Sequence, residues 1–200
     1  MKRTKREMNQ TDDNNNFHKL MHSLTLLSVI IWLIFAFIYQ IFRNEVFLTF
    51  AITFGTIFYH FIMRLIVGFC TRQIRRDFDY NGRWFRKKKF EDQLYKSLKV
   101  KRWKDMMPTY NPSTFSLQQH SPKEIIRTMC ISELGHEINI VLSFVPLSFA
   151  LLWGAFPVFL ITSVAAAFMD AVFVVMQRYN RPRMIRMMEK FKGLSGNSIF

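Results

Sequence analysis

The chain has only two cysteines, Cys70 and Cys130. No Cys-x-x-Cys pair occurs, and no Cys/His cluster has metal-site spacing, so the sequence argues against a structural zinc site and a redox dithiol. A glycine-rich phosphate-binding loop is also missing. Both cysteines fall in segments assigned below to the cytosol, where a disulfide is not expected. Cys130 is interpreted as a structural thiol, with an acyl-thioester intermediate as the alternative.

Acidic residues are scarce as well: Asp and Glu number 14 against 28 Lys and Arg, which gives a net charge of +14. Half of the residues are nevertheless apolar, and the chain contains 22 Phe. A soluble domain of this length rarely combines so many Phe residues with so much positive charge. The apolar runs require lipid or a large core, whereas the charge requires water or anions. The two therefore occupy different parts of the chain.

Long uncharged runs predict helices that span a membrane. Ser23 to Phe42 contains no charge, and at about 1.5 Å per residue it matches a hydrocarbon core of about 30 Å. A second run, Val46 to Met63, follows after a turn of three residues. A third, from Ile138 to Met176, is too long for one helix and contains a turn signal at 154–157. We therefore predict an all-α integral membrane protein with about four transmembrane helices.

The distribution of Lys and Arg predicts which side of the membrane each segment occupies. Apart from Arg43 in the first turn, every Lys and Arg lies before the first span, between the second and third spans, or after the fourth. The positive-inside rule then places both termini and the central segment in the cytosol of a multi-pass protein of the cell membrane. Anionic lipid headgroups or phosphorylated cosubstrates are the expected partners of this charge, and a soluble nucleic-acid binder is not expected.

Five regions follow from these patterns. The segment 82–105 carries Phe90, Leu94 and Leu98 at helical spacing among many cations, which predicts one amphipathic helix lying in the interface, and a loop is expected over 106–120. Ser121 begins a capping box, so a helix should start at Pro122 and continue into the third span, with a kink at Pro146. The predicted regions are a disordered tail (1–19), a transmembrane hairpin (20–70), a basic interfacial segment (71–121), a helix leading into a second hairpin (122–176) and a basic cytosolic tail (177–200).

Titratable side chains gather where the third span meets the cytosol. Glu133 precedes His136 by three residues and so lies one helical turn from it, while His136 shares a stripe with Asn139. A His held in one tautomer by a carboxylate can act as a general base on a hydroxyl. The alternative is that these residues only end a helix at the membrane interface.

Asp170 lies about 9 Å inside the fourth span, where an unpaired carboxylate costs at least a few kcal/mol. It must therefore be paired, hydrated or protonated. We expect it within hydrogen-bond reach of another helix, facing Asn139 or His136, either as part of a site or as a structural contact between helices.

The motif QRYNRPR at 177–183 follows the fourth span directly. Its arginines, Arg178, Arg181 and Arg183, can bind phosphate or carboxylate groups bidentately, and Gln177, Tyr179 and Asn180 add orientable hydrogen-bonding groups. Pro182 is expected to prevent simple continuation of the helix. A positive-inside anchor is the alternative interpretation.

QRYNRPR, together with KVKRWKD at 99–105 and SELGH at 132–136, resembles the glycosyl-diaponeurosporenoate acyltransferase family of the staphyloxanthin-type carotenoid pathway. The resemblance covers roughly residues 84–190. It implies transfer of a fatty acyl group to a sugar hydroxyl of a glycosylated lipid. The family pattern falls on Trp103, Lys104, Glu133, His136 and the residues from Gln177 to Arg183.

From the residues and the resemblance together, we expect His136 to be the base and Glu133 to orient it. The three arginines and Lys104 are expected to bind the acyl donor, which is acyl-CoA or another acyl carrier. No bound cofactor or metal is expected. Alternatives are an integral-membrane lipid or isoprenoid methyltransferase and a non-enzymatic scaffold that binds anionic lipid.

Overall fold

The structure is a computed structural model and describes residues 2–74, 78–107 and 115–196. The described part is helical and contains no strand. Four helical segments are long and apolar enough to cross a membrane: Lys19–Phe42, Glu45–Gln73, Pro122–Trp153 and Phe156–Lys190. These confirm the predicted fold class and indicate a multi-pass membrane protein.

The first two spans form the predicted tight hairpin. Helix α1 (Lys2–Phe42) ends just before Arg43, which has a φ of 49°, and α2 (Glu45–Gln73) begins after Asn44. The Asn44 side chain accepts a hydrogen bond from the backbone N–H of Val46 at 2.8 Å, so it caps α2. Stacked aromatic rings then hold the helices together, including the pairs Phe35–Phe50, Phe35–Phe54 and Trp32–Phe58.

The N-terminal region differs from the expected disordered tail. In the structure α1 already begins at Lys2 and runs without interruption into the first span. The segment from Lys2 to Phe42 contains no Pro and no Gly. Because no residue breaks the hydrogen-bond ladder, a helix that forms in the apolar part can extend into the polar part.

The second hairpin follows the predicted signals closely. Helix α5 (Pro122–Leu142) starts with the complete capping box of Ser121 and Glu124. After α5 the chain forms a 3₁₀ segment, η4 (Val145–Phe149), with Pro146 in its first turn, and then the short helix α6 (Ala150–Trp153). The interruption at Pro146 confirms the predicted kink. Gly154 and Ala155, with φ of 66° and 49°, form the predicted turn before α7 begins.

The prediction that Pro182 stops the last helix is wrong. Helix α7 (Phe156–Gly196) contains Pro182 in its interior and continues beyond it. An interior proline removes one backbone hydrogen bond and crowds the carbonyl four residues earlier, which here is that of Arg178. The Arg178 and Arg181 side chains, on the turn that this proline disturbs, are each anchored by several contacts described below. These contacts keep the chain helical through the proline.

The basic segment is not the single amphipathic helix that was predicted. It consists of η1 (Arg83–Phe85), α3 (Glu91–Ser97), α4 (Val100–Trp103) and η2 (Lys104–Met106). The break between α3 and α4 falls at Lys99, whose φ is 50°. Tyr95 and Val100 are buried, whereas the apolar side chains of Phe90, Leu94 and Leu98 are exposed. Of the predicted loop, residues 108–114 lie outside the described residues.

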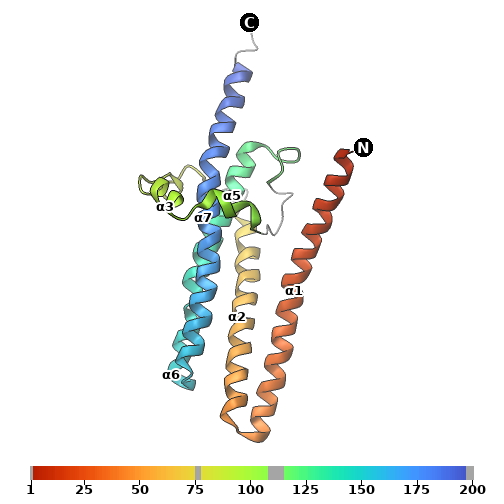
Figure 1. The fold of residues 1–200 in the computed structure, drawn as a ribbon, viewed down its shortest axis with the longest axis vertical. Helices are drawn as coiled ribbons and strands as arrows, with labels where there is room; N and C mark the ends of the chain where they lie inside the picture. Colours follow the sequence, from red (N-terminus) through yellow and green to blue (C-terminus); the bar gives the residue numbers. More distant parts are fainter. Residues whose placement is uncertain (1, 75–77, 108–114, 197–200) are drawn as a thin grey trace.

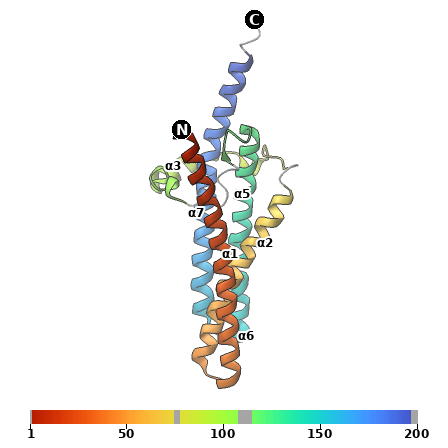
Figure 2. The ribbon, with the colours of Figure 1, turned by 90° about the vertical axis from the view of Figure 1, so that its right-hand side faces the viewer.

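The helices α2, α5 and α7 lie side by side, and α1 lies against α2 (Figures 1 and 2). The described ends of α1 and α7 nearest the two termini lie at one end of the bundle, and both hairpin turns lie at the other (Figure 1). Helix α3 lies beside α7 in the half that contains the termini (Figure 1). The polar part of the chain therefore gathers at one end of the four spans.

Candidate active site

Five charged side chains form a cluster where the basic segment meets α5 and α7. We call it the arginine–carboxylate cluster; its members are Glu91 of α3, Glu133 and Glu137 of α5, and Arg178 and Arg181 of α7. Arg178 is its centre, with Nε 2.8 Å from Glu133, Nη1 3.0 Å from Glu91 and Nη2 3.4 Å from Glu137. Arg181 forms a second ion pair with Glu133.

Hydrogen bonds of Trp84 and Phe85 attach the basic segment to this cluster. Arg181 Nη2 donates to the Phe85 carbonyl at 2.5 Å, and the Trp84 indole donates to Glu137 at 2.7 Å. Glu133 and Arg181 are almost fully buried, at 0% and 2% exposure. A buried ion pair contributes little net stability, but loss of one partner leaves a costly unpaired charge. The cluster therefore fixes where η1 and α3 sit on the helical bundle.

The sequence interpretation expected these arginines to bind the acyl donor. In the structure Arg178 and Arg181 already have carboxylate partners, while Arg183 has none among the described residues. Arg183 donates to the Tyr179 hydroxyl at 2.5 Å and stacks over its ring. Of the three arginines, Arg183 is the one whose charge remains available to an anion.

Tyr95 continues the cluster into α3. Its hydroxyl donates to Glu91 at 2.9 Å, and its ring contacts that of Tyr179 edge-on, with centroids 5.2 Å apart. Burial and the hydrogen bond to Glu91 raise the pKa of Tyr95 well above its usual value. Tyr95 thus stays a neutral donor and holds Glu91 toward Arg178.

A second group of polar side chains lies one to two turns deeper in the spans. We call it the intramembrane cluster; its members are Arg64 of α2, His136 and Asn139 of α5, and Asp170 of α7. Asp170, only 1% exposed, is 2.5 Å from Arg64 Nη2 and 2.8 Å from His136 Nδ1. The Asn139 amide also donates to it at 3.3 Å. The expectation that Asp170 reaches polar groups on another helix is confirmed.

This geometry changes the expected partner of His136. Glu133 was predicted to orient the imidazole, but it pairs with the two arginines instead, and Asp170 is the carboxylate at His136. Arg64 balances the charge of Asp170, so Asp170 is treated as a carboxylate that can only accept hydrogen bonds. A neutral His136 in contact with it therefore carries its proton on Nδ1. Nε2 then carries a free lone pair, which is the state that a general base requires.

The remaining expected site residues lie on α7 and in the basic segment. Gln177 approaches Ser132 at 3.5 Å, so it lies at the α5–α7 contact near both clusters. Asn180 is half-buried on α7. Trp103 donates to the Leu98 carbonyl of its own segment, and Lys104 follows it in η2. The indole N–H of Trp103 is therefore used within the basic segment and not by either cluster.

Three contributors were missed from the sequence. Arg64 directly follows the predicted run Val46 to Met63 and lies inside the span Glu45–Gln73 of the structure, so the reasoning that singled out Asp170 applies to it equally. Glu91 and Trp84 gave no signal, because a charged or aromatic residue in a basic surface segment is ordinary. Only the tertiary structure brings them to Arg178 and Glu137.

Cys130 is fully buried, with its Sγ 3.8 Å from Arg181 Nη1. This burial agrees with a structural thiol. Among the described residues, no group of three His, Cys, Asp or Glu side chains is arranged to hold a metal ion.

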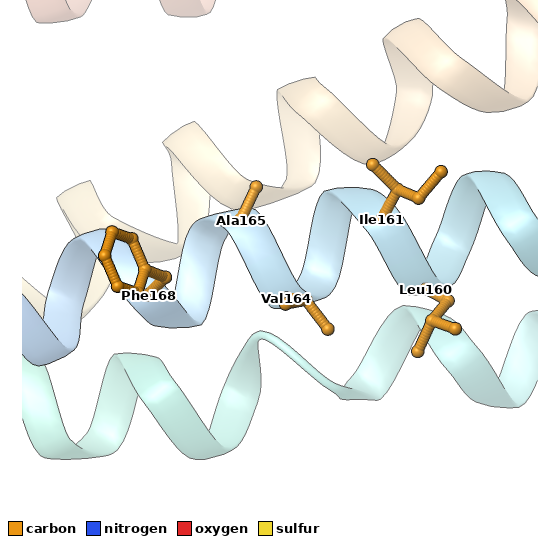
Figure 3. Close-up of a pocket in the computed structure, with 5 residues that line it drawn as sticks. All are labelled: Leu160, Ile161, Val164, Ala165 and Phe168. Carbon is orange, nitrogen blue, oxygen red and sulfur yellow. The ribbon is translucent and has the colours of Figure 1, made fainter.

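Two apolar grooves lie on the surfaces of the spans. One of about 290 Å³ is lined by Glu137, Ile138, Val141 and Leu142. Its first lining residue, Glu137, directly follows His136 in the sequence. The other, of about 500 Å³, is lined by Leu160, Ile161, Val164, Ala165 and Phe168 (Figure 3). Figure 3 shows these five side chains along one stretch of α7.

Residues 81–190 match the family model of glycosyl-4,4'-diaponeurosporenoate acyltransferase. No curated protein and no solved structure matches the chain. The matched segment includes the whole arginine–carboxylate cluster as well as His136, Asn139 and Asp170, but not Arg64, α1 or α2. Since it spans more than half of the sequence, the chain belongs to the glycosyl-4,4'-diaponeurosporenoate acyltransferase family.

Proposed function

We propose that the protein transfers a fatty acyl group from a cytosolic donor to a hydroxyl of a glycosylated or other lipid acceptor at the cytosolic membrane interface, with His136 as general base. Family membership supports acyl transfer over the methyltransferase and the scaffold. The observation that carries the assignment of the base is the 2.8 Å contact between His136 Nδ1 and Asp170.

The reaction follows from this contact. His136 Nε2 accepts the proton of the acceptor hydroxyl while its oxygen attacks the carbonyl carbon of the acyl donor. Asp170 stabilises the imidazolium that forms, and Arg64 and Asn139 hold Asp170 in place. The bond from the carbonyl carbon to the donor's leaving group then breaks, and the imidazolium returns its proton to that group. The products are an ester and the free carrier, and His136 is neutral again.

The donor is acyl-CoA or another acyl carrier, and we assign its anionic part to Arg183 with Lys104. Arg183 is exposed and its charge is not neutralised by a carboxylate in the described part of the chain. Arg178 and Arg181 instead hold the basic segment beside the site through Glu133 and Glu91. The donor headgroup thus stays in water while acyl chains remain in lipid.

The cytosolic placement rests on the positive-inside rule and on the common location of the polar groups. The arginine–carboxylate cluster lies where α3 contacts α5 and α7, and α3 lies in the half of the bundle that carries the ends of α1 and α7 (Figure 1). Cysteine probes at Asn44 and Ala155 should react from outside intact cells, and a probe at Ser97 should not. Labelling at Ser97 would place the site on the opposite side.

The decisive test compares lipids from cells that express the parent protein, His136→Gln or His120→Gln. Glutamine at position 136 can still donate to Asp170 but cannot accept the hydroxyl proton as a base. The matched control changes a partly exposed His that lies just before α5. Mass spectrometry should show an acylated lipid with the parent and the control, and its loss with His136→Gln at equal protein levels. An undiminished product from His136→Gln would rule out His136 as the base.

A further inference from the structure

Apart from the charged Arg127 and Glu133, three polar side chains inside the spans have buried atoms without a hydrogen-bond partner among the described residues. They are both ring nitrogens of His60, Oδ1 of Asn139 and Oγ of Ser163. These residues are 6%, 5% and 0% exposed and come from α2, α5 and α7 respectively. We call the three together the polar column.

The helical periodicity turns all three toward the same interior. His60 is seven and eleven residues before Val67 and Thr71, which face α5 at Gly135, so it lies on the α5-facing side of α2. Ser163 is seven residues before Asp170 and shares its inward stripe on α7. Asn139 already points there, because its amide contacts Asp170.

The hydrogen bonds of Arg64 also fix the depth of the column. Arg64 donates to the His60 carbonyl at 2.8 Å and to the Ala166 carbonyl at 3.0 Å, so this turn of α2 is level with the turn of α7 before Asp170. From Asp170, Ser163 lies about 10 Å further along α7 toward the hairpin turns. The column therefore continues directly from the intramembrane cluster into the membrane.

Unpartnered polar groups at this depth demand an explanation. A buried donor or acceptor without a partner costs about 1–3 kcal/mol, and apolar residues of similar shape would avoid that cost. Three such residues, on three different helices and facing one interior, are better explained by a bound partner than by three separate defects.

We infer that His60, Asn139 and Ser163 bind hydroxyl-type oxygen atoms, which can both donate and accept hydrogen bonds. The column has acceptors in Asn139 Oδ1 and one His60 nitrogen, and donors in the other His60 nitrogen and Ser163. The nearest charges, Arg64 and Asp170, neutralise each other, so a neutral group fits and a phosphate or carboxylate does not.

Such oxygens have two sources: hydroxyls of the acceptor lipid or ordered water. The first rests on the proposed function, since it places the acceptor against His136 from the membrane side. The second does not, because water would bind in the resting protein regardless of the reaction.

The test uses His60→Leu and Ser163→Ala in the full-length protein in detergent micelles, with Ser148→Ala as the matched control. Ser148 is exposed and donates to a backbone carbonyl. Three quantities are measured: thermal unfolding, the acceptor dependence of acyl transfer, and hydroxyl-radical labelling of Met63, a buried α2 residue beside the column.

Binding of acceptor hydroxyls predicts at least a tenfold rise in the acceptor KM for both column variants, with the donor KM and the control unchanged. Binding of water predicts labelling of Met63 in the substrate-free parent and its loss in His60→Leu. The inference is overturned if both variants unfold at a higher temperature than the parent, with unchanged KM and no labelling of Met63 in any protein. Labelling and unfolding need no activity, so they stand even if His136 proves not to be the base.

Discussion

Replacement of Arg64 tests whether Asp170 is an ion held in place inside the membrane. Arg64→Met keeps a long apolar stem but removes the ion pair with Asp170 and the hydrogen bonds to the carbonyls of His60 and Ala166. Asp170 is then left 1% exposed with only His136 and Asn139 as partners. Removing one partner of a buried ion pair costs about 3–5 kcal/mol. We expect a loss of that size in the free energy of unfolding, together with loss of acyl transfer.

Arg64→Lys separates charge from geometry. A lysine retains the positive charge, but its ammonium group cannot contact Asp170 and both carbonyls at once as the planar guanidinium does. At about 0.5–1.5 kcal/mol for each of two lost hydrogen bonds, its stability should fall by roughly 1–3 kcal/mol. Arg72→Met, an exposed position on the same helix, is the control.

The double variant Arg64→Met/Asp170→Asn supplies the refutation. If the two side chains form an ion pair, the neutral amide removes the unpaired charge, and the double variant should be more stable than Arg64→Met alone. Unfolding in detergent micelles with increasing denaturant measures all four proteins of the cycle. Strictly additive effects, or a fully stable Arg64→Met, would show that Asp170 is neutral and that Arg64 does not position it.

Four further variants probe the rest of the site and the first hairpin. Arg181→Lys should destabilise the protein by roughly 2–4 kcal/mol, because one lysine cannot contact both the buried Glu133 carboxylate and the Phe85 carbonyl. Arg183→Lys should instead leave the free energy of unfolding unchanged and raise the donor KM. Equal unfolding free energies of the two variants would contradict these different roles. Tyr95→Phe should cost about 1 kcal/mol near neutral pH. Burial and the Glu91 contact raise the pKa of Tyr95, so this stabilisation is complete below about pH 10 and is lost as the pH rises through the higher pKa of the folded state. An ultraviolet difference titration of the parent against Tyr95→Phe should show one tyrosine that titrates late. Absence of that tyrosine would disprove the raised pKa. Gly55→Ala should loosen the α1–α2 hairpin, since its Cβ would approach the Trp32 ring to 2.9 Å; an unchanged melting temperature would argue against this packing.

Features set by length, composition and local chemistry could be predicted from the sequence. The spans depend on the number of apolar residues needed to cross a bilayer, and the start of α5 depends on the Ser121 capping box, which acts within one turn. The need of Asp170 for a partner follows from the cost of an isolated charge in lipid.

Features set by tertiary contacts could not be predicted. The spacing of Glu133 and His136 shows that they are neighbours on α5, but not which helix each one faces. Glu133 faces the arginines of α7, and Asp170 is the carboxylate at His136. The capture of Glu91 by Arg178 depends on how α3 docks, for which its short basic sequence gives no pattern.

The last helix has a mechanical consequence. At about 1.5 Å per residue, the 41 residues of α7 extend roughly 60 Å, about twice the thickness of the hydrocarbon core. The part of α7 beyond the arginine–carboxylate cluster therefore extends past the other helices, and it belongs to the same helix that carries Asp170 (Figure 1). A tilt of this part of the helix is transmitted along α7 to the site. The helix bends most easily at Pro182, where one backbone hydrogen bond is missing. A load applied beyond Pro182 would consequently reach Arg181 and Arg178 before it reached Asp170.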